Sequence, residues 1–269
     1  MPFDQAFGEI ITIGYSHLIA MALAMARGMG MVIIFPVFLH TGITGMLRNA
    51  VVIAMALPLL PHVIAEVDRV GEPGTLILMG VILKEGFVGF LLGLALGIPF
   101  WGIQSAGDVI DFQRGSTGAN MSDPSQTSEA TVTGTFLMLT MIMLFFMIGG
   151  MMIVIETLYQ TYAIWPIFDF TPSFSIESAA AMFKLIDEIM RLAFVVAGPL
   201  IIAMFLGDAV LAAISRFAPQ LNVFALSMGV KTAIFVALMP IYTVFLFDYV
   251  GAAFAPLHDI AEQFRRMIQ

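Results

Sequence analysis

The chain has 269 residues, of which 60% are hydrophobic, and its mean hydropathy is +0.98. This composition excludes a water-soluble globular protein, which needs far more polar surface to cover its core. The formal net charge of −8 argues against nucleic-acid binding, because phosphate contacts need clustered basic residues and the only adjacent basic pair is Arg265-Arg266.

The chain begins with an acidic segment that contains Asp4 and Glu9. A cleavable signal peptide carries positive charge before its apolar core, so we expect the first helix to be retained. Arginines such as Arg27, Arg48 and Arg69 are scattered singly, so the distribution of positive charge indicates little about orientation. The Arg265-Arg266 pair favours a cytoplasmic C-terminus.

Several apolar stretches approach the length of about 20 residues that a membrane-spanning helix needs. They cover residues 10–25, 51–65, 86–103, 134–155, 192–206 and 232–247. We therefore predict an all-α membrane protein with about six to eight apolar helices that form hairpins. We expect residues 1–269 to make a single integral membrane domain.

Turns are predicted where glycine, proline and polar residues interrupt the first third of the chain: at 40–45, at Pro58 and Pro61, and at 66–74. The next apolar stretch runs from Thr75 to residue 103 and is interrupted only by Lys84 and Glu85. Neighbouring helical residues point about 100° apart and do not face each other. We therefore expect each of these two charges to have a partner elsewhere.

The end of this helix is polar. Asp108, Asp111 and Arg114 are spaced by three residues, so they share one helical face, and Asp111 is able to pair with Arg114. Gln113 belongs to the same segment. Two interpretations stay open: a charged face that lines an ion path or seats another subunit, or a helix end that emerges into water with a local ion pair.

Residues 115–131 form a polar stretch rich in small residues, between two very apolar segments. We predict a long loop, either exposed to solvent or held at membrane depth by protein or a water-filled cavity. A long helix over 134–162 follows, with a kink at Gly149-Gly150, and it ends at Trp165-Pro166.

The last third contains an amphipathic helix over 176–192, expected at an interface or against a partner, and an amphipathic tail over 253–269. Glu156, Asp208, Lys231 and Asp248 stand alone in apolar surroundings. An ionised group at the bilayer centre costs about 2.5–3.5 kcal/mol, so pairing between helices or subunits is favoured over catalysis. The residues expected to make intramembrane or intersubunit polar contacts are Lys84, Glu85, Asp108, Asp111, Gln113, Arg114, Glu156, Asp208, Arg216, Gln220, Asn222 and Lys231.

No motif for catalysis, metal or cofactor binding is present. The histidines stand singly without a His-Glu-x-x-His pattern, and no phosphate-binding glycine loop occurs. Ser105 and Phe205 occupy the positions where an intramembrane aspartyl protease of the Gly-x-Gly-Asp type has glycine. Without cysteine, disulfides and thiolate metal sites are excluded. We expect no enzyme activity and no cofactor.

A series of short motifs nevertheless has a specific order. They are KEGFVGFLLG at 84–93, PFW at 99–101, GDVIDFQRG at 107–115, LYQTY at 158–162 and SRFAPQLNVF at 215–224. This series resembles the SctT/FliR family, export-apparatus subunits of bacterial type III secretion systems, and the form at 107–115 looks like the injectisome branch. One departure is Gly229, where many relatives have proline.

The resemblance implies a multi-pass subunit of the bacterial inner membrane, within the secretion basal body. It would join SctR-like and SctS-like subunits in a helical export gate, beside an SctU-like subunit, and form part of the channel entrance for unfolded secreted proteins. The resemblance also implies a plug in the closed channel, formed by Gly115, Ser116, Thr117, Gly118, Ala119, Asn120 and Met121. Small residues suit such a narrow site.

Two alternatives remain at this point. A secondary transporter would use Lys84, Glu85 and Asp208 to bind a small solute or ion. A pure assembly scaffold would tolerate changes in the loop without loss of secretion.

Overall fold

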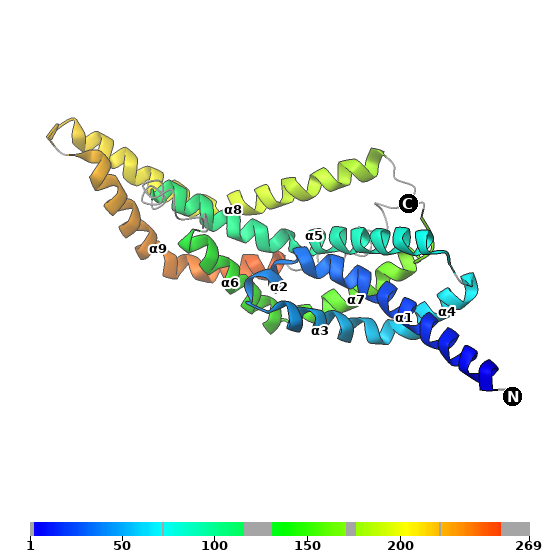
Figure 1. Cartoon of the computed structure of the whole chain (residues 1–269). Helices are drawn as coiled ribbons and strands as arrows, with labels where there is room; N and C mark the ends of the chain where they lie inside the picture. Colours follow the sequence, from blue (N-terminus) through cyan, green and yellow to red (C-terminus); the bar gives the residue numbers. More distant parts are fainter. Residues whose placement is uncertain (1–2, 72, 116–130, 171–175, 221, 254–269) are drawn as a thin grey trace. The chain divides into compact units, whose positions relative to one another are not determined.

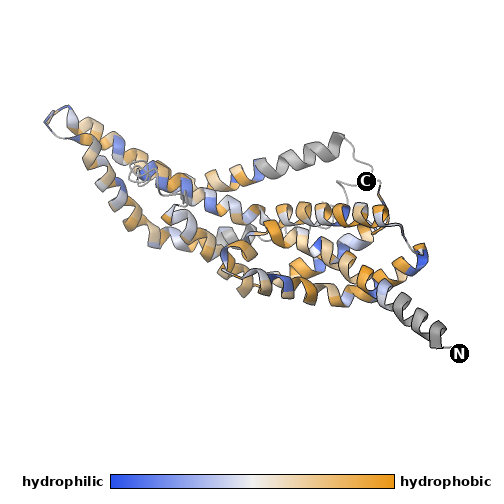
Figure 2. Ribbon diagram, in the orientation of Figure 1, coloured by the Kyte–Doolittle hydropathy of each residue, from blue (hydrophilic) through white to orange (hydrophobic). Residues whose placement is uncertain are grey.

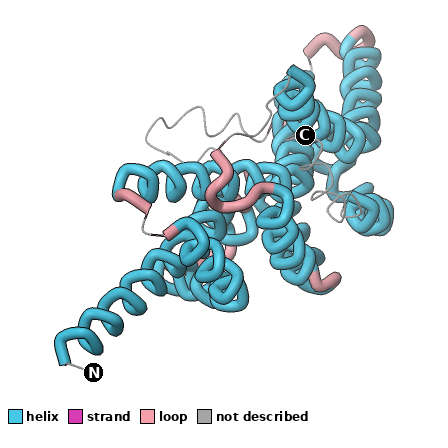
Figure 3. Tube along the Cα trace, turned by 90° about the vertical axis from the view of Figure 1, so that its right-hand side faces the viewer, coloured by secondary structure: helices cyan, strands magenta, loops and turns pink. Residues whose placement is uncertain are grey.

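The computed structural model describes residues 3–71, 73–115, 131–170, 176–220 and 222–253. Figure 3 shows helices joined by loops, with no strand among those residues. The prediction of an all-α fold is confirmed. The helices of Figure 1 are α1 (Phe3–Ile34), α2 (Pro36–His40), α3 (Gly45–Ala56), η1 (Leu57–Leu59), α4 (Leu60–Val70), α5 (Thr75–Arg114), α6 (Val132–Met147), α7 (Gly150–Ile164), α8 (Ile176–Ser215) and α9 (Val223–Ala253).

Within the described residues, five helical segments are long and apolar enough to cross a membrane. They are Gly14–Ile34, Gly45–Val70, Thr75–Arg114, Asp187–Ser215 and Ala225–Phe247. A sixth span results if α6 and α7 are counted together. Figure 2 shows hydrophobic residues along all of these helices, interrupted by few hydrophilic positions. The predicted multi-pass membrane protein is therefore confirmed.

The helix boundaries agree with most predicted breaks. The chain turns between His40 and Gly45 as predicted. A separate turn at Pro58 and Pro61 is wrong, because only the short 3-10 segment Leu57–Leu59 interrupts the span Gly45–Val70. Both prolines lie in the first turn of a helical segment, where the missing N–H is not needed. The helix ends at Val70, just before Gly71.

Gly149 breaks the long helix predicted over 134–162. Its φ of +75° lies in the left-handed region, which glycine adopts at little cost, and it separates α6 from α7. The α7 helix ends at Ile164, immediately before Trp165. Both the kink and the end of this stretch are confirmed.

The chain folds as two compact units. Of the described residues, the first contains 3–71, 73–97, 149–170 and 176–182, and the second contains 98–115, 131–148, 183–220 and 222–253. The α5 and α8 helices each contribute to both units. A single membrane domain over the whole chain stays a prediction.

In the first unit, α1 packs against α3 and α4, as Figure 1 also shows. The α1 helix also crosses α5 at very short distance. A Cβ atom added to Gly89 would lie 1.8 Å from the carbonyl oxygen of Arg27, and one added to Gly30 would lie 2.0 Å from that of Gly86. Small residues permit such close contact between membrane helices. This crossing brings Arg27 next to the charged pair on α5.

In the second unit, the end of α5 packs against the start of α6. A Cβ on Gly107 would lie 2.5 Å from the Cα of Gly134. The rings of Phe100 and Phe145 meet edge to face, 5.4 Å between centroids, and join the same two helices. The α8 and α9 helices run side by side as a hairpin in Figure 1, held in part by the ion pair between Asp208 and Lys231.

The α8 helix is longer than the sequence indicated. The amphipathic segment over 176–192 and the apolar run after it form one helix, Ile176–Ser215. Pro199 lies inside it. A contact between the amphipathic segment and a partner stays a prediction.

Candidate functional site

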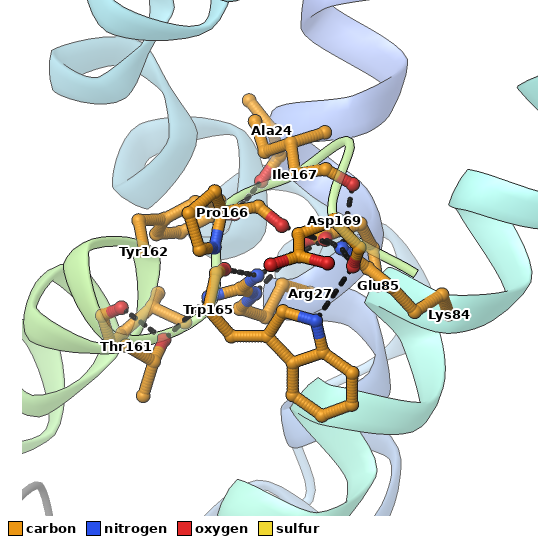
Figure 4. Close-up of polar contacts among 11 residues, drawn as sticks. Ala24, Arg27, Lys84, Glu85, Thr161, Tyr162, Trp165, Pro166, Ile167 and Asp169 are labelled. Atoms are coloured by element: carbon orange, nitrogen blue, oxygen red, sulfur yellow. Dashed lines mark hydrogen bonds and ion pairs between the residues drawn. The ribbon is translucent and has the colours of Figure 1, made fainter. Parts of the chain in front are cut away.

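Two clusters of polar side chains lie inside this apolar protein, one in each unit. In the first unit, Arg27 on α1 and Glu85 on α5 are both fully buried. Arg27 donates from Nε to Glu85 Oε2 at 2.8 Å and from Nη2 to Oε1 at 3.0 Å (Figure 4). Two parallel bonds of this kind make a strong and directional ion pair.

Arg27 also binds the end of α7. Its Nη1 donates to Thr161 Oγ1 and its Nη2 to the backbone oxygen of Trp165, each at 2.9 Å. The guanidinium carbon lies 3.9 Å from the centroid of the Tyr162 ring, a cation–π contact. Tyr162 in turn donates its hydroxyl hydrogen to the backbone oxygen of Ala24 at 3.2 Å. A single arginine therefore joins α1, α5 and α7 (Figure 4).

Lys84 makes a second connection between α5 and the segment that follows α7. Its Nζ donates to the backbone oxygens of Pro166 at 2.8 Å and Ile167 at 2.6 Å. The expected partners elsewhere in the chain are confirmed for Lys84 and for Glu85. The expectation that these neighbours do not face each other is wrong: Lys84 Nζ lies 2.7 Å from Glu85 Oε1, because its long side chain curls back.

Among the described residues, every buried side-chain nitrogen or oxygen has a hydrogen-bond partner. The cluster therefore presents satisfied charges that order the helices, and no free group for chemistry. Sequence reasoning treated Arg27 only as one of several scattered arginines. The available signal was its position as a lone charge inside an apolar stretch, where a partner is required.

The second cluster lies where α5 ends and α6 begins. Asp111 is 1% exposed and accepts hydrogen bonds at both carboxylate oxygens. Its Oδ1 accepts from Arg114 Nη2 and from Thr133 Oγ1, each at 2.7 Å, and its Oδ2 accepts from the backbone N–H of Thr133 at 2.8 Å. The predicted pair between Asp111 and Arg114 is confirmed. Since Asp111 is buried, a helix end that emerges into water does not describe this residue.

Asp108 contacts the same helix start through Thr131. Thr131 donates its hydroxyl hydrogen to Asp108 Oδ1 at 2.7 Å and accepts the backbone N–H of Gly134 at 3.0 Å. Thr131 is the N-cap of α6, a position that favours threonine because its oxygen binds a free N–H. Thr131 and Thr133 were not predicted as contact residues, although they lie at the end of the polar stretch and just after it.

Arg114 extends this cluster to α9. Its guanidinium carbon lies 4.8 Å from the centroid of the Phe235 ring. The next residue, Gly115, has a φ of +83° and ends α5 with backbone bonds to residues 111 and 112. The remaining predicted plug residues, Ser116, Thr117, Gly118, Ala119, Asn120 and Met121, lie outside the described residues. The tail over 254–269 lies outside them as well.

The other predicted polar residues are spread over both units. Asp208 Oδ2 and Lys231 Nζ lie 3.2 Å apart across α8 and α9, which confirms pairing between helices. Glu156 is exposed and accepts from Gln160 of its own helix at 3.2 Å. The backbone N–H of residue 225 donates to Asn222 Oδ1 at 3.2 Å.

Three further residues were expected to make polar contacts, and their side chains differ in how far they are exposed. Gln113 is half-buried, and Arg216 and Gln220 are exposed. Contacts of these residues and of Glu156 with other subunits stay predictions. In the part of the chain that the structure describes, no three histidine, aspartate or glutamate side chains lie together as a metal site.

The sequence matches known proteins over nearly its full length. Residues 18–257 match the family described as bacterial export proteins, family 1. The Yop proteins translocation protein T of Yersinia pestis is 36% identical over 243 residues, which cover 90% of this chain and 92% of that protein. The surface presentation of antigens protein SpaR of Salmonella typhimurium is 31% identical over 228 residues, 84% of each chain.

A flagellar protein is similar over a shorter part. The flagellar biosynthetic protein FliR of Bacillus subtilis is 30% identical over 158 residues, which cover 58% of this chain and 61% of that protein.

Proposed function

This chain belongs to the bacterial export proteins, family 1, and we propose that it is an inner-membrane subunit of a type III protein export apparatus. The observation that carries the proposal is the extent of the similarity, from residue 18 to residue 257. The predicted resemblance to the SctT/FliR family is confirmed. Several helices long enough to cross a membrane agree with a multi-pass protein in the bacterial inner membrane.

Within this apparatus, the chain is an export-gate subunit, and the apparatus is an injectisome. The relatives named for Yop translocation and for surface presentation of antigens support this branch, since each is matched over most of its length. In this role the chain joins SctR-like and SctS-like subunits, with an SctU-like subunit alongside. Its substrates are unfolded proteins that pass the channel entrance. The chain acts as part of a conduit and not as an enzyme.

The polar stretch that starts at Gly115 serves as a plug of this entrance. The arrangement of the end of α5 and the start of α6 supports this role. The bond from Thr131 to Asp108 and the bonds from Thr133 to Asp111 join the end of α5 to the start of α6. The two described ends that border this stretch, at Gly115 and Thr131, therefore lie close together in the second unit.

The transporter alternative is not favoured. A transporter needs charged groups inside the membrane that are available to a solute. Arg27, Lys84 and Glu85 are instead bonded to one another and to backbone oxygens. Asp208 is paired with Lys231.

Purification of the tagged chain from its native membrane in mild detergent, followed by mass spectrometry, tests the proposal. Recovery of small hydrophobic export subunits in several copies is the expected result. Two matched variants accompany it: Gly86→Ala, with nothing within 4 Å of the added methyl group, should recover the same partners, whereas Gly89→Ala, with no room for it, should accumulate poorly. A clean monomer or homodimer of the unaltered chain would overturn the proposal in favour of a transporter.

A further inference from the structure

We propose that Asp108 and Asp111 are positioning residues that lock the start of α6 onto the end of α5, and that this junction stays closed while protein passes. The inference rests on the proposed function as a gate subunit. It assigns no movement during export to the two helix ends.

Asp111 satisfies the start of α6 in two ways. The first backbone N–H groups of a helix have no partner within it, and its N-terminus carries partial positive charge. Asp111 places a buried carboxylate there and accepts the N–H of Thr133 at 2.8 Å. The ion pair with Arg114 at 2.7 Å neutralises the carboxylate. Opening the junction would leave a buried charge and a helix end without partners, which is unfavourable.

Asp108 contacts the start of α6 indirectly, through the hydroxyl of Thr131. It accepts from the hydroxyl of Thr131, and that hydroxyl accepts the N–H of Gly134. The carboxylate thus orients the capping oxygen toward the helix. A carboxamide oxygen could accept the same single bond, so this position needs an acceptor but not a charge.

The backbone at this junction has no free space. A Cβ on Gly134 would lie 2.2 Å from Asp108 Oδ1, and one on Gly107 would lie 2.5 Å from the Cα of Gly134. Closely packed backbones do not deform gradually, so the two helix ends behave as one rigid element. Arg114 adds α9 to this element through the Phe235 ring, 4.8 Å away.

The sequence left open whether the charged face at the end of α5 lines an ion path. The same contacts argue against this interpretation. Both oxygens of Asp111 are used by Arg114 and Thr133, and the residue is 1% exposed. An ion path needs a carboxylate that exchanges its partners with water or ions. The structure assigns Asp111 to position the helix.

Two isosteric Asp→Asn variants test the assignment. One removes an acceptor and a charge that the junction requires, and the other keeps the acceptor that the junction requires. Asp111→Asn replaces one of two accepting oxygens with an NH₂ group that faces another donor, and it removes the counter-charge of Arg114. Asp108→Asn keeps an acceptor for Thr131 and is the matched control. Each variant is placed in the complete secretion apparatus. Three quantities are then measured: the amount of assembled gate on native gels, secretion of a natural substrate, and ion leak without substrate.

We expect Asp111→Asn to assemble and to raise the resting leak per assembled gate roughly tenfold. One unsatisfied buried polar group shifts the equilibrium between closed and open junction by about this factor. Asp108→Asn should leak as the unaltered protein does. Equal leak from both variants would overturn the inference. So would an Asp111→Asn gate that is merely less abundant, since a purely structural role lowers assembly without changing the leak per gate.

A cross-link tests whether the junction stays closed. The chain has no cysteine, so the double variant Asp108→Cys/Thr131→Cys can form only the intended bond within the chain. The disulfide replaces the contact between these two side chains, so we expect the oxidised variant to secrete as well as the unaltered protein. Secretion that stops on oxidation and returns with a reductant would overturn the inference, because the junction would then have to open.

Deletion of residues 116–130 separates this inference from the proposed plug. If the deletion leaks but Asp111→Asn does not, the positioning role fails and the plug stands. If the deletion leaks no more than the unaltered gate, the plug fails. The cross-link result still decides whether the junction opens.

Discussion

Replacing Glu85 should destabilise the first unit more than replacing Arg27, although the two form one ion pair. Glu85 is shared by two cations, with Arg27 Nε 2.8 Å from its Oε2 and Lys84 Nζ 2.7 Å from its Oε1. Glu85→Gln leaves both cations beside a neutral group. Arg27→Met leaves Lys84 and Glu85 as a pair of opposite charge.

The magnitude follows from burial, since Arg27 and Glu85 are both 0% exposed. Removing one partner of a buried ion pair costs about 3–5 kcal/mol, because the other charge stays buried. We expect Glu85→Gln to fall in this range and Arg27→Met to fall near its lower end. In the double variant Arg27→Met/Glu85→Gln no charge of the pair remains. Its cost should therefore be smaller than the sum of the single costs by at least about 2 kcal/mol.

The assay is unfolding of the purified chain in mixed micelles, followed by tryptophan fluorescence. Trp165 lies in the cluster, since its backbone oxygen accepts from Arg27. The double-mutant cycle is completed with both single variants under identical micelle composition. A Glu85→Gln chain within about 0.5 kcal/mol of the unaltered protein, as for an ordinary surface substitution, would refute the reasoning. A double-variant cost equal to the sum of the two single costs would refute it too.

Three other predictions follow from single contacts. Gly89→Ala should sharply reduce the amount of folded chain in membranes, because its Cβ would lie 1.8 Å from a carbonyl oxygen of α1, whereas Gly86→Ala, with nothing within 4 Å, should accumulate normally. Asp208→Lys should reduce the assembled gate on native gels, and the exchange Asp208→Lys/Lys231→Asp should restore it, since the pair is only 3.2 Å apart. Tyr162→Phe removes one buried hydrogen bond but keeps the ring over the guanidinium, so micelle unfolding should register a loss of about 1 kcal/mol.

Local patterns allowed most of the architecture to be predicted. Apolar length identified the membrane spans, and Gly149-Gly150 marked the break between α6 and α7. The spacing of three residues correctly indicated the pair between Asp111 and Arg114. These features depend on residues within about one or two helical turns of each other.

Partners across helices were not predictable in the same way. Arg27 and Glu85 are 58 residues apart, and Arg27 and Thr161 are 134 residues apart. Nothing in the local sequence around Glu85 or Thr161 identifies Arg27 as the partner. Periodicity indicates which residues share a face, but not which helix that face meets or at what height.

The sequence by itself determined that this protein lies in a membrane, that it is helical, and that its few charges need partners. Only the tertiary structure decided which charges meet. That choice depends on the rotation and register of whole helices, which the close crossing of α1 and α5 at Gly89 and the junction of α5 and α6 at Gly134 establish. Hydrophobicity places a helix in the membrane but does not determine its rotation or register. Backbone contact at glycine and directional hydrogen bonds select one arrangement.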